Sequence, residues 1–464
     1  MDTLLHEHFM HDKSLYHSIA TMVDTLSYHQ QAIVGITNGR APLSEKFKQL
    51  CQEANTARGG NLYYPYLGSG FGKGPYVELA DGSIKLDLIC GIGPHFWGHS
   101  NKDIIRESLR ASLSDILMQG HLQQNTDAID LMNVIINLAS SGGAKLEHCF
   151  LSSIGAMANE NALKILFQHK QPADRILCFE QCFSGRTLAT AEMTDKAAFR
   201  QGLPDTLKVD YIPFYDSTSP KEGTERTIDA LESHLQRNPD KYAGMCLELI
   251  QGEGGFKVGS KKFFEEIFAV LKRHDIPVWI DEIQTFGRTS KPFAFQHFEL
   301  DKYVDIITMG KMSQVCATIF SNKLKPNPGL LSQTFTASTT AINVAKFLLC
   351  DKSFTSLFGK KGKNQQLHNC FVKKLKRLNK KYPEHFQGPY GMGGMIAFTV
   401  FNGDMQRTKV FLNDLFDAGV ITFIAGSNPA RVRFLPPIPI LEESHIDEAF
   451  DVIESTFKKN LIDE

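Results

Sequence analysis

The stretch PVWIDEIQTFGRT at residues 277–289 has the pattern of a buried strand that ends abruptly in acidic residues. Asp281 and Glu282 follow the apolar run at the expected carboxyl end of the strand, the edge at which open α/β sheets bind ligands. A buried carboxylate is costly unless a proton or a cation faces it. The pattern predicts that Asp281 faces a positively charged group of a ligand, with Gln284 close by. The alternative is a carboxylate that caps the following turn.

The stretch VDIITMGKMSQVCATIF at residues 304–320 places Gly310 and Lys311 between two apolar, strand-like runs. A lysine in the interior loses part of its affinity for a proton, which makes its amine nucleophilic and able to act as a base. The alternative is a lysine whose amine reaches solvent. The gap at residues 310–314 is too short for a crossover helix, so one of the two strands is expected to run antiparallel.

Five further apolar runs precede these two, and most of the seven are followed by a segment with helical spacing, such as residues 159–170 and 261–274. Strands that alternate with helices are typical of an α/β fold with a mostly parallel sheet. The seven predicted strands are residues 148–153, 175–180, 209–214, 243–250, 276–281, 304–309 and 315–320.

The two ends of the chain differ from its middle in composition and in sequence pattern, which suggests a second, smaller domain. Residues 1–100 are rich in glycine, histidine and aromatic residues, whereas the C-terminal part runs from a Lys-rich helical stretch to RFLPPIPI. We expect a large α/β domain at residues 101–345. Residues 1–100 and 346–464 are expected to supply a smaller α+β domain, the N-terminal segment also contributing to a dimer interface.

The composition excludes several classes of partner. The 464 residues hold 50 Lys plus Arg against 51 Asp plus Glu, which leaves no surplus positive charge for a nucleic acid or an anionic membrane. Apolar runs are too short for a spanning helix, and the first residues lack the apolar core of a signal peptide. Nine cysteines without a CxxC pair favour the reducing cytoplasm.

Two other patterns carry no function. LGSGFGKGP at residues 67–75 departs from a nucleotide-binding phosphate loop, and we interpret it as a flexible turn. His95 and His99 lack the glutamate of a zinc hydrolase, so a structural histidine pair is favoured and no metal is expected. No GxGxxG follows a predicted strand, which argues against a dinucleotide-binding dehydrogenase.

Two loops complete a set of residues suited to pyridoxal 5′-phosphate. SSIGAMANENALKIL at residues 152–166 predicts a helix whose first amides, at Gly155 and Ala156, favour an anion such as a phosphate. Phe183 follows another predicted strand and can stack on a flat ring, although a lone phenylalanine is more often part of a core. The cofactor also needs a lysine amine and a carboxylate at its ring nitrogen, for which Lys311 and Asp281 are the candidates.

With these motifs the chain resembles the class III pyridoxal-phosphate-dependent aminotransferases, the group of ornithine, acetylornithine, 4-aminobutyrate and lysine 6-aminotransferases. The resemblance spans residues 74–440, with DEIQTFGRT and the Gly-Lys after DIITM as its strongest motifs. It implies fold type I and a homodimer with active sites at the interface. It also implies roles at named positions: phosphate binding by Gly155 and Ala156, ring contact by Phe183 and Ser184, pairing with the ring nitrogen by Asp281, contact with the 3′-oxygen by Gln284, the internal aldimine at Lys311, and contact with the other subunit's phosphate by Thr334.

The resemblance also implies a substrate class. Arg433 matches an arginine that binds a substrate α-carboxylate, and Glu248 matches a glutamate that can pair with that arginine while an ω-amine reacts. Both residues favour a transaminase that moves the amino group of an ω-amino or diamino acid to a keto acid such as 2-oxoglutarate, with ping-pong kinetics through Lys311. The identity of the donor stays open.

Several positions depart from the family pattern. Met157, Ser184 and Leu249 replace the usual acidic residue, histidine and proline, the DEIQTFGRT loop is one residue shorter, and no Gly-Asn-Pro follows Thr334. These departures suggest a divergent subfamily. Two alternatives therefore remain: an aminomutase, racemase or decarboxylase with the same cofactor residues, and a dimeric binding protein that keeps the fold without catalysis.

Overall fold

Seven strands form one sheet at the centre of the computed structural model, which describes residues 4–462. All neighbouring strands run parallel except β13, which is antiparallel to both β12 and β5. The seven predicted strands and the antiparallel partner are confirmed. In spatial order they are β5 (His148–Ser152), β13 (Cys316–Phe320), β12 (Ile306–Met309), β11 (Val278–Glu282), β8 (Tyr242–Leu247), β6 (Arg175–Phe179) and β7 (Lys208–Ile212).

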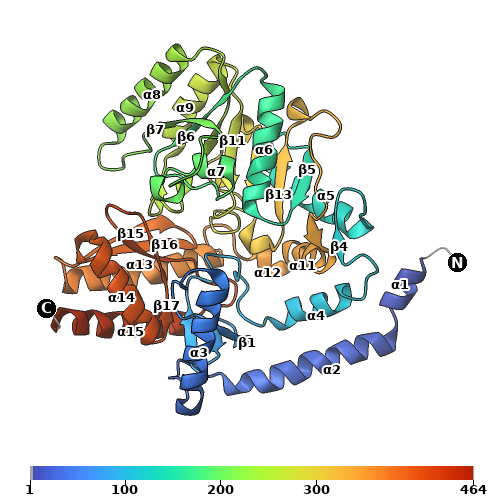
Figure 1. Cartoon of the computed structure of the whole chain (residues 1–464), viewed down its shortest axis with the longest axis vertical. Helices are drawn as coiled ribbons and strands as arrows, with labels where there is room; N and C mark the ends of the chain where they lie inside the picture. The colour runs from blue at the N-terminus through green and yellow to red at the C-terminus, as the bar shows by residue number, and fades with distance from the viewer. Residues whose placement is uncertain (1–3, 463–464) are drawn as a thin grey trace.

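Helices connect and cover these strands, as Figure 1 shows in its green, yellow and orange parts. α9 (Lys261–Arg273) buries phenylalanine, isoleucine, valine and leucine side chains at helical spacing, and its N-cap Ser260 accepts a hydrogen bond from the Phe263 amide. The others are α5 (Thr126–Ser140), α6 (Gly155–His169), α7 (Leu188–Glu192), α8 (Pro220–Arg237), α10 (Ala294–His297), α11 (Thr339–Cys350) and α12 (Lys352–Thr355).

Two four-stranded sheets lie outside the central one, and one of them joins the two ends of the chain. β1 (Gly68–Lys73), β2 (Tyr76–Leu79) and β3 (Ile84–Asp87) are completed by β17 (Val420–Ile421), which runs parallel to β3. The other sheet has the order β15 (Phe386–Met392), β16 (Met395–Val400), β19 (Arg431–Phe434) and β18 (Phe423–Ala425). The domain boundaries at residues 100 and 345 stay a prediction.

The remaining elements belong mainly to the two ends of the chain. In Figure 1 the long helix α2 runs beneath α4 and away from the body of the molecule. Among residues 4–462 no helix is long and apolar enough to cross a membrane. These elements are α1 (Leu5–Met10), α2 (Lys13–His29), α3 (Ala41–Arg58), α4 (Lys102–Ala111), α13 (Lys363–Lys381), α14 (Met405–Asp417), α15 (Glu443–Ile462) and the short strands β4 (Met118–Gln119), β9 (Ile250–Gln251), β10 (Lys257–Val258) and β14 (Ala337–Ser338).

The interpretation of LGSGFGKGP as a flexible turn is wrong, because residues 68–73 form strand β1. Backbone pairing with β2 holds this strand, and only Gly74 and Pro75 make the turn between the two. Close packing explains Gly72, because a Cβ there would lie 2.5 Å from the His99 side chain. Glycine here permits a close approach of the backbone rather than mobility.

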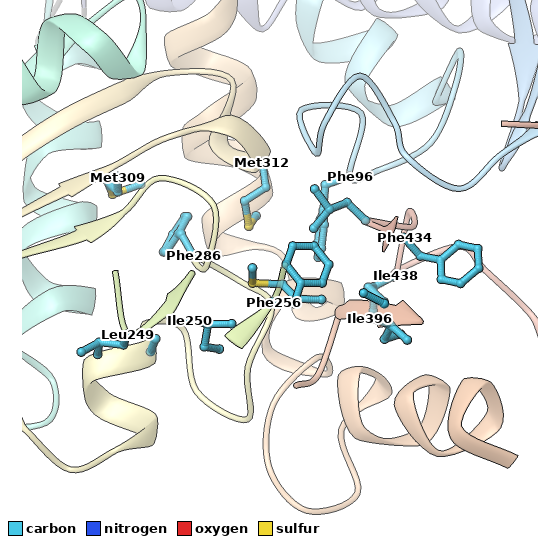
Figure 2. Close-up of a cluster of buried hydrophobic side chains, with 14 of the residues drawn as sticks. Phe96, Leu249, Ile250, Phe256, Phe286, Met309, Met312, Ile396, Phe434 and Ile438 are labelled. Atoms are coloured by element: carbon cyan, nitrogen blue, oxygen red, sulfur yellow. The ribbon is translucent and has the colours of Figure 1, made fainter. Parts of the chain in front are cut away.

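A continuous apolar cluster joins the central sheet to both ends of the chain. Figure 2 shows side chains of this cluster extending from Met309 and Phe286 of the central region, past Phe96 of the N-terminal part, to Phe434 of β19. These side chains are at most 1 % exposed. Because one cluster packs all three regions together, residues distant in the sequence are held in fixed positions around the sheet edge.

Candidate active site

A cavity of about 440 Å³ opens at the carboxyl edge of the central sheet. The segments that follow β5, β6, β8, β11 and β12 all reach this edge, because those five strands are mutually parallel. Eight of the ten predicted site residues line it, whereas Thr334 and Arg433 do not. The eight are Gly155, Ala156, Phe183, Ser184, Glu248, Asp281, Gln284 and Lys311.

Asp281 is the last residue but one of β11 and is 6 % exposed. Its Oδ1 accepts the Ile283 amide at 3.0 Å, and its Oδ2 accepts Nδ2 of Asn159 at 2.9 Å. Burial raises the pKa of Asp281 to about 6, although both hydrogen bonds oppose that shift. Two hydrogen bonds therefore orient the carboxyl group, but they do not offset the effect of burial on its pKa. A cationic group of a ligand would stabilise the carboxylate, and this is the role that the sequence predicts for Asp281.

Lys311 follows β12 after one residue, Gly310, and lines the same cavity. Its φ of 56° lies in the left-handed region, a strained conformation for a lysine. Burial, followed by the charge of Arg433, lowers the pKa of the Lys311 ammonium to about 8. A substantial share of its amine is thus neutral near physiological pH, which suits a nucleophile.

The N-terminus of α6 begins at Gly155, as predicted, and points at the cavity. No side chain caps it, since the N-cap residue is Ile154, so its first amides stay available for an anion. A Cβ at Gly155 would lie 2.9 Å from the Ile283 side chain, which leaves little room for a larger residue. The half-buried Phe183 lines the cavity near this helix.

Two buried amide oxygens in the cavity wall lack a hydrogen-bond partner: Oε1 of Gln284 and Oδ1 of Asn159. Asn159 links Asp281 to the loop after β6, because its Nδ2 also donates to the Ser184 carbonyl at 2.7 Å. Buried polar atoms without a hydrogen-bond partner cost free energy of folding, and a ligand that donates a hydrogen bond to them offsets this cost.

The predicted pairing of Glu248 with Arg433 is wrong. Glu248 lies at the end of β8, where its two oxygens accept the amides of Phe183 and Gly252, each at 2.9 Å. Both oxygens are thus already held by the backbone of neighbouring loops. Burial, followed by the charge of Asp281, raises the pKa of Glu248 to about 8. Glu248 therefore shapes the cavity wall and makes no ion pair with the arginine.

Arg433 pairs instead with Glu253, whose Oε1 accepts from Nη2 at 2.6 Å. The arginine is fully buried on β19, while Glu253 is partly exposed and lines the cavity. Nε and Nη1 of Arg433 are buried without a partner. The guanidinium thus keeps two free donors next to a carboxylate that already neutralises it.

Thr334 lies outside the cavity of its own chain, against the backbone of the segment near β4. A Cβ added to Gly120 would lie 1.8 Å from the Thr334 carbonyl oxygen, which places the two backbones in close contact. The location within one chain therefore gives Thr334 no role in that chain's cavity. The family role assigned to this residue, in the site of a second subunit, stays a prediction.

Sequence reasoning missed four residues that organise the site. Asn159 stands one helical turn after Gly155, and Glu253 stands five residues after Glu248, so both could have been found from their spacing. The buried Arg288 donates to the carbonyls of Gly93, Gly394 and Pro436, which ties the N-terminal and C-terminal regions to the loop after β11. No local pattern marks such a long-range contact.

Asp281 also caps the turn that follows it, the alternative considered for that residue, because its Oδ1 accepts the Ile283 amide two residues on. Glu282, the fourth of these residues, caps a different segment. It accepts the amides of Ala294 and Phe295 at the start of α10. His99 likewise meets a partner, since its Nε2 lies 2.9 Å from Asp87 and its ring stacks on His95. This arrangement is the structural histidine pair that the sequence favoured over a metal site.

Comparisons with known proteins agree with this geometry. The family model described as aminotransferase class-III matches residues 69–457. Acetylornithine aminotransferases from Prochlorococcus marinus and Listeria innocua are each 28% identical to this chain, over 84% of it and over 91% and 95% of their own lengths.

Solved structures share the fold. The lysine aminotransferase of M. tuberculosis, in its internal aldimine form, superposes with a TM-score of 0.78 at 21% identity, covering 88% of this chain and 99% of the other. The ornithine aminotransferase of Toxoplasma gondii gives 0.73 at 23% identity, covering 88% and 94%. With a family match over most of its length, the chain belongs to the class III aminotransferases, which are pyridoxal-phosphate-dependent enzymes.

Proposed function

We propose that this enzyme transfers the terminal amino group of an ω-amino or diamino acid to a keto acid such as 2-oxoglutarate, in two ping-pong half-reactions. The observation that carries the proposal is the ion pair of Arg433 with Glu253. While the pair is closed, the arginine offers no net charge to the α-carboxylate of a donor, so a donor can present its ω-amine. A keto acid brings a carboxylate that competes with Glu253 for the guanidinium.

The residues of the cavity fit pyridoxal phosphate. Uncapped amides at the α6 N-terminus suit its phosphate, and the partly neutral amine of Lys311 suits its aldehyde. Asp281 suits a protonated ring nitrogen, and the unpartnered Oε1 of Gln284 marks a polar atom that still needs a ligand group. The cofactor supplies a reactive aldehyde and a ring that accepts electrons from the substrate carbon.

The protein's own groups then divide the work. The Asp281 carboxylate keeps the ring nitrogen protonated, and Asn159 and the Ile283 amide hold the carboxylate in place. Lys311 would hold the cofactor through its amine, and the same amine would move a proton from and to the substrate, as a general base and then as a general acid. The carboxylate of the keto acid displaces Glu253 from Nη2 of Arg433 and binds Nη2 together with the unpartnered Nε, the side-on edge of the guanidinium.

We also propose a homodimer whose second subunit completes each site. Family resemblance implies that Thr334 contacts the phosphate in the other subunit, which is compatible with its position outside its own chain's cavity. Large apolar side chains are exposed around it: Phe335, the next residue, at 56 %, and Leu122 at 101 %, in the segment that hydrogen-bonds to the backbone of residues 333–336. Covering such residues is a common use of a subunit interface. The nine unpaired cysteines support a cytoplasmic location.

A donor screen tests the proposed function. The holoenzyme is mixed with N-acetylornithine, ornithine, lysine or 4-aminobutyrate without a keto acid, and the cofactor spectrum is followed through this half-reaction. We expect at least one donor to convert the cofactor fully, and 2-oxoglutarate to restore it with formation of glutamate. Reaction of α-amino acids alone, or turnover without formation of a second amino acid, would contradict the proposal.

A further inference from the structure

The loop at residues 252–256 contributes to two cavities. Glu253 lines the candidate active site, whereas Phe256, labelled in Figure 2, lines a second cavity of about 730 Å³ together with Lys257. The second cavity lies between the segment after β7 and strands β15 and β19, and it has the size of a small-molecule site. It shares no lining residue with the first cavity.

Arg431 is the most deeply buried cation of this second cavity, at 9 % exposed. It stands two residues before Arg433 on β19, so both side chains leave the same face of the strand toward the loop. Nη1 of Arg431 donates to the Gly255 carbonyl, and the guanidinium lies 3.5 Å from the centre of the Tyr390 ring. Nε is buried without a partner.

The free edge of Arg431 has the geometry that binds a carboxylate. Nε and Nη2 form the side-on edge of a guanidinium, and in this protein Arg175 uses that edge to hold Asp210, at 2.6 and 2.7 Å. The more deeply buried Arg288 has no carboxylate partner either, but it donates to three carbonyls. Arg431 has one carbonyl only, and within residues 4–462 no acidic side chain forms an ion pair with it.

The other charges around the cavity leave an excess of positive charge beside Arg431. Asp216 is already neutralised by Arg226 at 3.2 Å, and Glu180 is exposed to solvent. The charge of Arg431, after burial, contributes to the lowered pKa of Lys257, whose Nζ finds only the side-chain oxygen of Gln181 at 2.9 Å. Two cations thus face one cavity with no buried counter-charge.

We propose that Arg431 and Lys257 form a binding site for a small organic carboxylate, separate from the Arg433 site. The carboxylate takes the Nε–Nη2 edge of Arg431 side-on, and the organic part of the ligand lies against the apolar and aromatic side chains of the cavity, Phe214 and Tyr215 among them. Lys257 adds the second charge. The hydrogen bond from Nη1 of Arg431 to the Gly255 carbonyl stays intact. The bound ligand is therefore linked through Arg431 to the loop at residues 252–256, which also carries Glu253.

The test measures equilibrium binding of benzoate to the holoenzyme by calorimetry, with benzamide as a neutral ligand of matched shape. We expect saturable binding of benzoate and at least tenfold weaker binding of benzamide. Arg431→Gln and Lys257→Gln are each expected to weaken benzoate binding, the first by about tenfold or more, the scale of a lost charge-assisted hydrogen bond. Lys262→Gln, an exposed lysine on α9, serves as the control and should bind benzoate as the unchanged protein does.

Three outcomes would overturn the proposal. They are equal binding of benzamide, tighter binding of inorganic phosphate than of benzoate, and benzoate binding that is lost in Arg433→Gln but kept in Arg431→Gln. The last result would place the ligand in the catalytic cavity. Because the comparison of benzoate with benzamide needs no variant, the proposal stays open to refutation even if Arg431→Gln fails to fold.

Discussion

The two walls of the catalytic cavity are built on opposite principles. On the cofactor wall, Asp281 is held by the Ile283 amide and by Asn159, both of which belong to the central sheet and its connections. On the facing wall, Glu253 and Arg433 are held chiefly by each other, across a loop and a strand that are distant in the sequence. One wall has its partners fixed by the fold, and the other has a pair that a ligand can separate.

From this difference we infer which side chains keep one position through the reaction and which can change partners. The cofactor wall contacts the same group in every turnover, so orientation by backbone amides gains from rigidity. The facing wall must receive two unlike substrates in turn. The ion pair of Arg433 with Glu253 can be closed, or open with a substrate carboxylate on the arginine, and Nε and Nη1 of Arg433 have no other partner to lose.

Lys311→Ala is expected to have the largest effect, because it removes the amine that moves the proton. Activity should fall by more than about 10³-fold, within the range for loss of a positioned proton-transfer group. The protein should also lose the absorption band of its bound cofactor. Lys302→Ala, an exposed lysine outside the cavity, is the control. Normal turnover in Lys311→Ala would contradict the roles given to the residues of both walls.

Asp281→Asn probes the rigid wall next. The amide keeps the size of the side chain but not its charge, so a protonated ring nitrogen loses its counter-ion. We expect activity to fall by about 10²-fold or more and the cofactor to bind less tightly. Spectroscopic titration of the apoenzyme with pyridoxal phosphate measures the affinity. Unchanged affinity together with an unchanged rate would contradict the role given to Asp281.

Glu253→Gln probes the wall that can change. Without the carboxylate, Arg433 is free to bind the α-carboxylate of a donor, so α-amines should compete better with ω-amines. The preference for ω-donors should fall by about tenfold or more, the scale of one hydrogen bond to a charged group. Half-reaction rates with both donor types measure it. Glu266→Gln, on the surface of α9, should leave the preference unchanged.

The smallest expected effect concerns pH. Burial lowers the pKa of Lys311 to about 8, so its neutral amine accumulates as the pH rises toward that value and is nearly complete above it. The rate at which apoenzyme captures pyridoxal phosphate should therefore rise from about pH 6 through pH 8, where half of the amine is neutral, and level off roughly one unit higher. A rate that keeps climbing toward pH 10, as for an exposed lysine, would show that the amine is not desolvated.

Much of the cofactor wall could be predicted from the sequence for a topological reason. Asp281 and Lys311 each follow an apolar strand, and parallel neighbours bring such ends to one edge wherever the rest of the chain goes. The abrupt change from apolar to charged residues marked both positions. The antiparallel course of β13 followed equally from the short gap after Lys311.

The facing wall could not be predicted in the same way. Two glutamates, Glu248 and Glu253, stand close together in the sequence, and only the path of the loop after β8 decides which one reaches Arg433. The strand ends at Leu247, so Glu248 turns into the backbone of the neighbouring loops. Similarly, the glycines at residues 68–74 suggested a turn, because neither the pairing of β1 with β2 nor the packing of Gly72 against His99 leaves a local pattern in the sequence.

The parallel pairing of β17 with β3 has a consequence for the newly made chain. Residues 84–87 leave the ribosome long before their partner at residues 420–421. At about 5–20 residues per second, one edge of β3 waits roughly 20–60 s for its neighbour. During that time it presents unpaired backbone groups to other nascent chains, so we expect yield to depend on how quickly the segment between the two strands is translated.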